Sequence, residues 1–248
     1  LLLEMGCKID RKFYYMHMED DLPDDLLKEY ELAIKKRAEH IPLQYIVGET
    51  EFMGLKFKVN SNVLIPRQDT ETLVEEALKT VKPGMKVLDM CTGSGCIIIS
   101  ILHNVEGVKG YAVDISKQAV NVAKENAKLN EVPVLFERSD LFEMVTEKFD
   151  VIVSNPPYIP TDVIPQLMPE VQVFEPIEAL DGKEDGLYFY RKIVEQSKDY
   201  LNSGGSLMFE IGYDQGKDVS KMMTDAGFSN VCVKKDLAGN DRVVTGML

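Results

Sequence analysis

The tetrapeptide Asn155-Pro156-Pro157-Tyr158 follows the apolar run 151–153, so its polar groups stand at the end of a predicted strand. It combines a side-chain amide, carbonyls of restricted geometry and an aromatic ring. Transfer of a group to a planar, weakly nucleophilic nitrogen needs this set, because the nitrogen must be held by its N–H groups and kept flat. The alternative interpretation is a proline-rich turn that closes a strand, since Asn-Pro often starts a turn.

The nitrogen of a planar NH₂ group is a poor nucleophile because its lone pair is delocalised, and the tetrapeptide offers two ways to overcome this. The Asn155 side-chain oxygen and the Pro156 carbonyl can each accept one N–H of such a group, which raises the charge on its nitrogen. Holding that nitrogen in line with the reacting group can supply about 7–11 kcal/mol. We therefore predict Asn155, Pro156 and Tyr158 as catalytic residues, with Tyr158 stacked on the plane of the target group. No dedicated general base is needed, because the nitrogen is strongly acidic once it is alkylated.

A second group of residues, 89–95, follows a predicted strand and opens a predicted helix with the sequence Asp-Met-Cys-Thr-Gly-Ser-Gly. Glycines let a ligand approach the backbone, and a helix N-terminus offers free N–H groups. Asp114 ends the next predicted strand, where a carboxylate can accept both hydroxyls of a ribose. Asp140 ends the third strand and can face an adenine ring, with Leu141 and Phe142 beside it.

The loop matches neither of two common nucleotide-binding patterns. Cys91 replaces the first glycine of the dinucleotide pattern, and the Gly-Lys-Ser/Thr of a P-loop is missing. Acidic strand ends and a turn without basic residues suit a cationic ligand that lacks phosphates, such as S-adenosylmethionine. A glycine-rich turn without a ligand, and Asp89 as a helix cap, are the alternatives.

The elements that must position these residues alternate along the chain. The predicted strands are 86–89, 110–113, 134–136, 151–153, 206–211, 231–233 and 243–245. The predicted helices are one from Asp69 or Thr70 to Val81, then 96–103, 116–129, 186–201 and 215–226. This alternation predicts an α/β fold, with a parallel sheet covered by helices on both faces.

The N-terminal part has a different character. Residues 1–45 are predicted to be helical, with Pro23 as the first residue of a helix, and 51–59 form a predicted hairpin with Gly54 in its turn. We divide the chain into a helical segment at 1–45, a β-hairpin linker at 46–66 and a main domain at 67–248.

Composition narrows the class of protein. The formal net charge of −13 over 248 residues disfavours direct nucleic-acid binding, which depends on Lys and Arg. The four cysteines form no CxxC pair, and the three histidines are scattered, so we expect neither a metal site nor a disulfide framework. No apolar stretch reaches the roughly 20 residues of a membrane span, and no signal peptide is visible. We expect a cytoplasmic protein, and a sequence that begins inside a longer chain.

In combination, the motifs resemble the HemK/PrmC family, the release factor glutamine N5-methyltransferases, within the S-adenosylmethionine-dependent, Rossmann-like, seven-stranded class. The resemblance covers roughly 40–248. The matching motifs are 42–48, 64–71, 89–95, 139–142, 154–158, 174–176, 179–182, 185–187 and 241–244.

The resemblance implies a monomeric enzyme that methylates the glutamine of the Gly-Gly-Gln motif in class-1 peptide chain release factors. It also implies a site. The predicted cofactor-binding residues are Asp89, Cys91, Thr92, Gly93, Ser94, Gly95, Asp114, Asp140, Leu141 and Asn155. The predicted substrate-binding residues are Asn155, Pro156, Pro157 and Tyr158. Arg67 and Glu175 are assigned either to a supporting shell or to simple surface ion pairs.

Three departures from the family pattern bear on these expectations. Cys91 stands where the family often has Gly, which is tolerable if its φ is negative. Gln68 replaces a usual Pro, which loosens the loop after Arg67. The N-terminal helical domain is shorter, so residues 1–40 are interpreted as its C-terminal remnant, which leaves substrate docking open.

Three other functions remain open. An adenine N6-methyltransferase grips a similar planar NH₂, but it would need a basic groove and a domain that recognises the target base. A ribosomal-protein glutamine methyltransferase would use the same chemistry with a different docking surface. The third alternative is a non-catalytic protein that only binds the cofactor.

Overall fold

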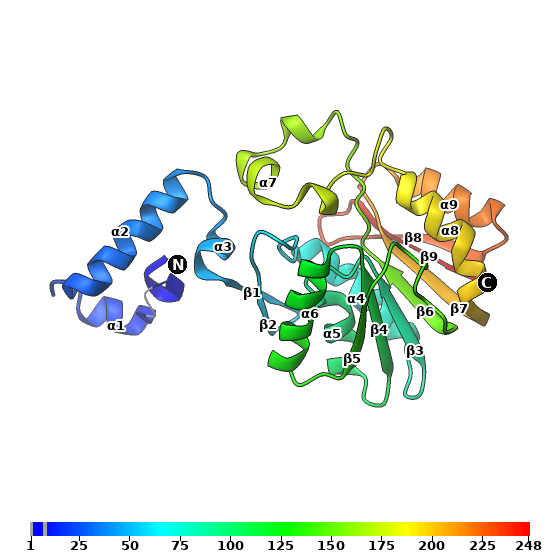
Figure 1. Cartoon of the computed structure of the whole chain (residues 1–248), viewed down its shortest axis with the longest axis horizontal. Coiled ribbons are helices and arrows are strands. Elements are labelled where there is room, and N and C mark those ends of the chain that lie inside the picture. Colours follow the sequence, from blue (N-terminus) through cyan, green and yellow to red (C-terminus); the bar gives the residue numbers. More distant parts are fainter. Residues whose placement is uncertain (1, 7–8) are drawn as a thin grey trace.

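The computed structural model describes residues 2–6 and 9–248, so Cys7 lies outside the described residues. A small helical part at the N-terminus stands beside a larger α/β part (Figure 1). The helical part contains η1 (Leu2–Gly6), α1 (Arg11–Met16), α2 (Asp24–Ala38) and α3 (Leu43–Val47). Pro23 precedes α2 as its N-cap and is not its first helical residue, which places the predicted start one residue too early.

A two-stranded antiparallel hairpin joins the two parts and contains β1 (Glu49–Phe52) and β2 (Leu55–Lys58). Its turn residues, Met53 and Gly54, have φ values of 50° and 74°, as a tight hairpin turn requires. The two backbone groups of Lys58 bond to the Asn126 side chain, with N···Oδ1 at 2.7 Å and O···Nδ2 at 3.0 Å. The hairpin is thereby fastened to the α/β part.

The α/β part is built on a seven-stranded sheet with the order β5-β4-β3-β6-β7-β9-β8. The strands are β3 (Lys86–Met90), β4 (Lys109–Asp114), β5 (Val134–Arg138), β6 (Phe149–Ser154), β7 (Leu201–Glu210), β8 (Ser229–Lys235) and β9 (Asp241–Met247). All seven predicted strands are present. The expected all-parallel arrangement is wrong for β9, which is antiparallel to both neighbours. The physical reason is its short connection to β8, which permits only an antiparallel return.

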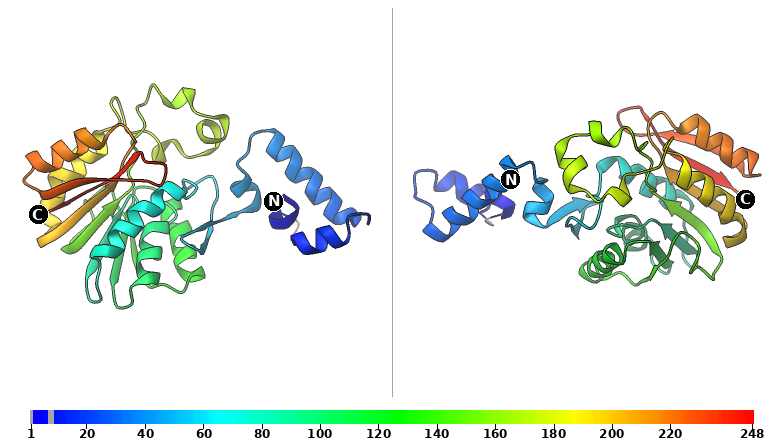
Figure 2. Two further views of the ribbon diagram at one scale, coloured as in Figure 1. Left: turned by 180° about the vertical axis from the view of Figure 1, so that it is seen from behind. Right: turned by 45° about the horizontal axis from the view of Figure 1, so that its top comes forward.

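Helices cover both faces of the sheet (Figures 1 and 2). One face carries α4 (Gln68–Thr80), α5 (Cys96–Asn104) and α6 (Lys117–Leu129), and the other carries α8 (Tyr188–Tyr200) and α9 (Gly216–Asp225). Adjacent strand residues alternate between the two cores: Val151 and Val153 belong to one apolar cluster, while Ile152 belongs to the other. The apolar runs of the sequence therefore correspond to strands buried on both faces.

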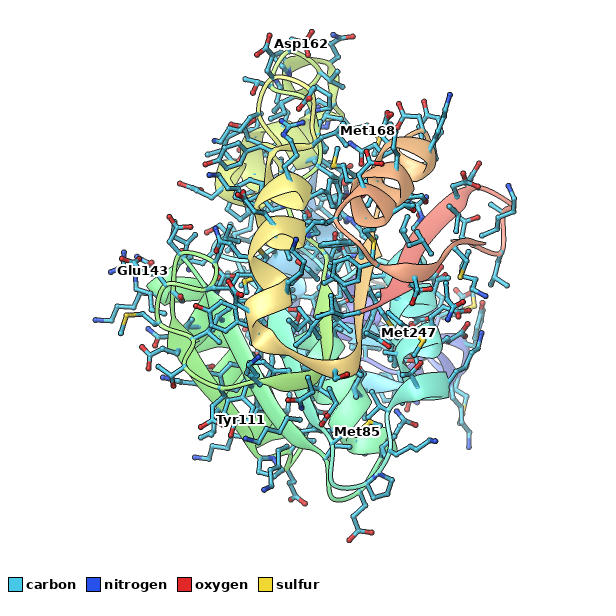
Figure 3. All side chains as sticks on the ribbon, turned by 90° about the vertical axis from the view of Figure 1, so that its right-hand side faces the viewer. Met85, Tyr111, Glu143, Asp162, Met168 and Met247 are labelled. Carbon is cyan, nitrogen blue, oxygen red and sulfur yellow. The ribbon has the colours of Figure 1, made fainter. Side chains whose placement is uncertain are left out.

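A long connection between β6 and α8 contains η2 (Ile164–Gln166), α7 (Pro169–Phe174) and η3 (Ile177–Ala179). We call residues 159–187 the covering segment. It lies above the sheet in Figure 1, and Figure 3 shows its Asp162 and Met168 at the end of the molecule opposite Met85. Because Met85 immediately precedes β3, the covering segment lies at the carboxyl ends of the parallel strands.

Within residues 2–6 and 9–248, no helix is long and apolar enough to cross a membrane. The same residues contain no group of three or more His, Cys, Asp or Glu side chains that could hold a metal ion.

Candidate active site

The carboxyl ends of four parallel strands surround a cavity of about 390 Å³. The order β4-β3-β6 places the cavity where successive connections leave the sheet in opposite directions, the usual ligand site of an open α/β sheet. Its lining at these strand ends includes Cys91, Thr92, Gly93, Ser94, Asp114, Asp140, Leu141, Asn155 and Pro157. The fold thus gathers most of the predicted site residues around one space.

Asp114 is fixed at the cavity by two backbone donors. The N–H of Gly93 donates to Oδ2 at 2.8 Å, and the N–H of Ser116 donates to Oδ1 at 2.9 Å. Burial raises the pKa of the carboxyl. Each oxygen keeps a further lone pair, so the side chain remains able to accept ligand hydroxyls.

Asp89 lies behind the loop and outside the lining of the cavity, and it is fully buried. Its Oδ2 accepts a hydrogen bond of 2.6 Å from the Thr92 hydroxyl, while its Oδ1 has no partner. Burial raises the pKa of Asp89 to about 7, and the Thr92 hydrogen bond opposes that shift. The geometry makes Asp89 a support for Thr92.

The backbone of Cys91 differs from expectation. Sequence analysis considered Cys91 tolerable if its φ is negative, but its φ is +62°, so this condition is not met. A left-handed position favours glycine, because an L side chain is strained there. Gly95 also has a positive φ and lies outside the lining, where a Cβ would meet Ile99 Cδ1 at 3.0 Å and Ala123 Cβ at 3.1 Å. Its lack of a side chain allows α5 and α6 to pack closely.

The turn after β5 carries Asp140 and Leu141 into the cavity lining. Asp140 is exposed and lies two residues beyond the strand, which ends at Arg138 and not at Asp140 as predicted. The Ser139 hydroxyl donates to the Leu141 carbonyl at 2.7 Å and accepts from the Met144 N–H at 3.0 Å. These bonds hold Leu141 at a φ of 47°.

The tetrapeptide is only partly at the surface of the cavity. Asn155 and Pro157 line it, whereas Pro156 and Tyr158 lie outside the lining. The backbone carbonyl of Tyr158 accepts a hydrogen bond of 3.0 Å from Gln215 Nε2. Burial raises the pKa of the Tyr158 phenol, which therefore stays neutral.

Two glycines of the covering segment approach Tyr158 closely. A Cβ at Gly186 would lie 2.3 Å from the Tyr158 carbonyl oxygen, and one at Gly182 would lie 2.8 Å from its Cα. Any larger residue would displace the tetrapeptide. The glycines of the motifs at 179–182 and 185–187 are thereby explained by backbone packing, which the sequence alone did not reveal.

Thr70 and Glu210 are site residues that sequence analysis missed. Asn155 Nδ2 is 3.4 Å from Thr70 Oγ1, and both side chains lie beside the carboxyl of Glu210, whose pKa they lower. Glu210 is fully buried, and burial raises its pKa to about 7. A carboxyl at the end of the apolar run 206–211 was the available signal.

Arg67 and Glu175 form a two-pronged ion pair, in which Arg67 Nη2 lies 2.8 and 2.7 Å from the two carboxylate oxygens. The Glu175 side chain is 1% exposed and that of Arg67 is 40% exposed. The pair is therefore more than a surface contact, since it ties the start of α4 to the covering segment. Arg67 also lines the cavity.

Comparison with known proteins shows the family of this chain. Residues 1–48 match the model of the PrmC N-terminal domain, and 67–167 match the Methyltransferase small domain. A release factor glutamine methyltransferase of Clostridium acetobutylicum is 45% identical over 251 residues, covering 98% of this chain and 88% of the relative. The chain belongs to the release factor glutamine methyltransferase family.

A second release factor glutamine methyltransferase, from Thermodesulfovibrio yellowstonii, is 46% identical over 217 residues, or 85% of this chain and 78% of the relative. Among solved structures, a methyltransferase from Pyrococcus furiosus has a TM-score of 0.60 at 21% identity and covers 86% of this chain and 98% of its own. That likeness concerns the fold. The predicted family, the methyltransferase class and the seven-stranded Rossmann-like fold are confirmed.

Proposed function

We propose that this chain transfers a methyl group from S-adenosylmethionine to the glutamine nitrogen of the Gly-Gly-Gln motif in class-1 peptide chain release factors. The observation that carries the proposal is the anchored amide of Asn155. Its nitrogen faces Thr70 and Glu210, so its oxygen is the end available to a substrate N–H. A neutral, oriented acceptor of this kind suits a carboxamide target.

The residues around the cavity fit the proposed cofactor. The volume of about 390 Å³ lies within the usual range for small-molecule sites. A Cβ built at Gly93 meets nothing within 4 Å, so the backbone of the loop is open to a close ligand. When bound, S-adenosylmethionine supplies an electrophilic methyl group and positive charge, which the carboxylates of Asp114 and Asp140 favour.

We propose the following roles for the tetrapeptide. The Asn155 oxygen and the Pro156 carbonyl each accept one N–H of the substrate amide, which orients its nitrogen and enriches it in charge. Pro157 and Tyr158 flank the amide and exclude water. The substrate loses its proton to solvent after methylation, so no side chain acts as a base.

A labelling assay tests the substrate. We expect label from S-adenosylmethionine on the glutamine of a purified release factor, and none on duplex DNA or ribosomal proteins. Label found only on DNA, or only on a ribosomal protein, would refute the proposal.

Asn155→Ala tests the mechanism. Loss of the oriented acceptor should lower turnover at least about 100-fold, by analogy with the removal of one preorganised hydrogen-bonding group. The affinity for S-adenosylmethionine should stay within a few-fold. Asn104→Ala is the matched control, because the Asn104 amide donates to the Ser100 carbonyl within α5 and lies outside the described lining of the cavity. Rapid turnover by Asn155→Ala would exclude this mechanism.

A further inference from the structure

Glu210 is a buried carboxyl that destabilises the fold, and none of the roles proposed for the tetrapeptide involves it directly. It ends β7, is fully buried, and its Oε2 has no hydrogen-bond partner. A buried carboxyl without full hydrogen bonding destabilises a fold by several kcal/mol, so its presence calls for a reason. The nearby cation, Arg242, is engaged elsewhere, with its Nη2 3.1 Å from Asp236 and 3.3 Å from Asp69.

The other contacts of Glu210 lead to the substrate amide site. The Thr70 hydroxyl and Asn155 lie beside its carboxyl and lower its pKa as hydrogen-bonding groups do, and Thr70 Oγ1 is 3.4 Å from Asn155 Nδ2. Thr70 itself is buried and belongs to the cavity lining. Three side chains from α4, β7 and the end of β6 therefore form one connected group.

The direction of hydrogen bonding in this group decides which end of Asn155 meets the substrate. An amide can turn by 180° with almost no change of shape, and only its oxygen can accept a substrate N–H. An ionised carboxylate accepts only, so the single hydroxyl hydrogen of Thr70 goes to Glu210. The Thr70 oxygen is then left to accept from Asn155, which keeps the nitrogen on that side.

We propose that Glu210 and Thr70 are positioning residues, which together hold the Asn155 amide with its oxygen toward the substrate. This inference rests on the proposed function, since it concerns the same acceptor. The mechanism predicts that protonation of Glu210 reverses the hydroxyl of Thr70 and disturbs Asn155. The charged and titratable groups that face Glu210 are Asp69, Cys96, Tyr158, Tyr190 and Arg242.

Thr70→Val and Thr70→Ser provide the test, with Thr245→Val as a matched control on β9. Release factor methylation, S-adenosylmethionine affinity and thermal stability are measured for each variant. We expect Thr70→Val to lower kcat at least tenfold, while its affinity for S-adenosylmethionine stays within threefold of the wild type. Thr70→Ser, which keeps the hydroxyl, should recover most of the rate, and Thr245→Val should match the wild type.

Glu210→Gln supplies the second readout. The glutamine amide donates to Thr70 as a protonated carboxyl would, so kcat should fall at least tenfold. Since the pKa of Glu210 is about 7, wild-type kcat should fall as the pH drops through that value, and the variant should lose this dependence. The inference would be overturned if Thr70→Val kept the wild-type kcat, or if Thr70→Ser lost as much kcat as Thr70→Val. It would also be overturned if kcat of Glu210→Gln kept the pH dependence of the wild type. A wild type that labels no release factor would instead overturn the proposed function.

Discussion

At the scale of single residues, two buried carboxyls dominate the electrostatics of the site. Asp89 and Glu210 each have a pKa of about 7 because burial disfavours their charged forms. When folding raises the pKa of a carboxyl, the stability that this group contributes is fully present below its unfolded-state pKa. That stability is lost as the pH rises through the folded-state pKa. These two side chains therefore oppose folding at neutral pH, which is a common feature of functional sites.

Glu210→Gln should change the pH dependence of stability. The wild-type carboxyl has a pKa of about 7 in the folded chain against a model value of 4.5. At 1.36 kcal/mol per unit, the free energy of unfolding of the variant relative to the wild type should rise by about 3 kcal/mol between pH 4.5 and pH 8. Urea unfolding at several pH values measures this difference. A constant difference would show that folding does not raise the pKa of this carboxyl.

Cys91 offers a second residue-scale prediction. Because its φ is +62°, Cys91→Gly relieves a strain that Cys91→Ala retains. The free energy of unfolding of the glycine variant should be about 1 kcal/mol higher than that of the alanine variant. Urea denaturation measures this difference. Cys91→Val should be less stable than either, since a β-branched residue is poorly suited to this conformation. A glycine variant less stable than alanine would contradict the strained geometry.

At the scale of elements, the covering segment is joined to the rest of the site by specific contacts. Gly182 and Gly186 allow its backbone to approach Tyr158, and Glu175 pairs with Arg67 at the start of α4. A second ion pair, between Arg37 of α2 and Glu170 of α7, joins the segment to the helical part. The segment is therefore held from two sides.

Arg67→Ala should destabilise the protein by about 2 kcal/mol, because it leaves the buried Glu175 carboxyl without its partner. The Arg67 side chain is 40% exposed, so the loss is smaller than for a fully buried pair. The exposed pair Lys221–Asp225 on α9, outside the covering segment, provides the control, and Lys221→Ala should cost less than about 1 kcal/mol. Hydrogen exchange within 159–187 should quicken in the first variant only. Equal losses of stability would show that the Arg67 pair has no special role.

At the scale of the whole molecule, the cavity and the helical part are separate in sequence. The described lining of the cavity runs from Asn62 to Phe189, and none of it comes from 2–6 or 9–61. The net charge of −13 gives no general attraction to nucleic acid, which agrees with a protein substrate.

Deletion of residues 1–41 should therefore leave the affinity for S-adenosylmethionine within about threefold of the full chain, since every described lining residue remains. Equilibrium binding measures this, and circular dichroism verifies that the remaining chain is folded. A folded deletion variant that has lost its cofactor affinity would show that the helical part shapes the cavity from a distance.

Much of the fold and part of the site are predictable from local patterns. Apolar runs such as 151–153 predict strands, because continuous apolar residues suit a sheet that is buried on both faces. The loop at 89–95 and Asp114 are predictable since parallel strands bring their carboxyl ends to one edge. The reversed direction of β9 was predictable from its short connection to β8, which the alternating pattern alone did not take into account. The positive φ of Cys91 was not predictable, because a left-handed backbone at a residue other than glycine has no local sequence signal.

The sequence by itself predicted the type of chemistry at the site, since Asn155-Pro156-Pro157-Tyr158 indicates a planar NH₂ group as target and the acidic loop at 89–95 indicates a cationic ligand. Only the tertiary structure decided how the acceptor is oriented. Thr70 and Glu210 lie 85 and 55 positions from Asn155, and they meet because β6 pairs with β7 and α4 packs against both strands. Hydrogen bonding acts over about 3 Å, so the partners of an amide are fixed by packing and not by position along the chain.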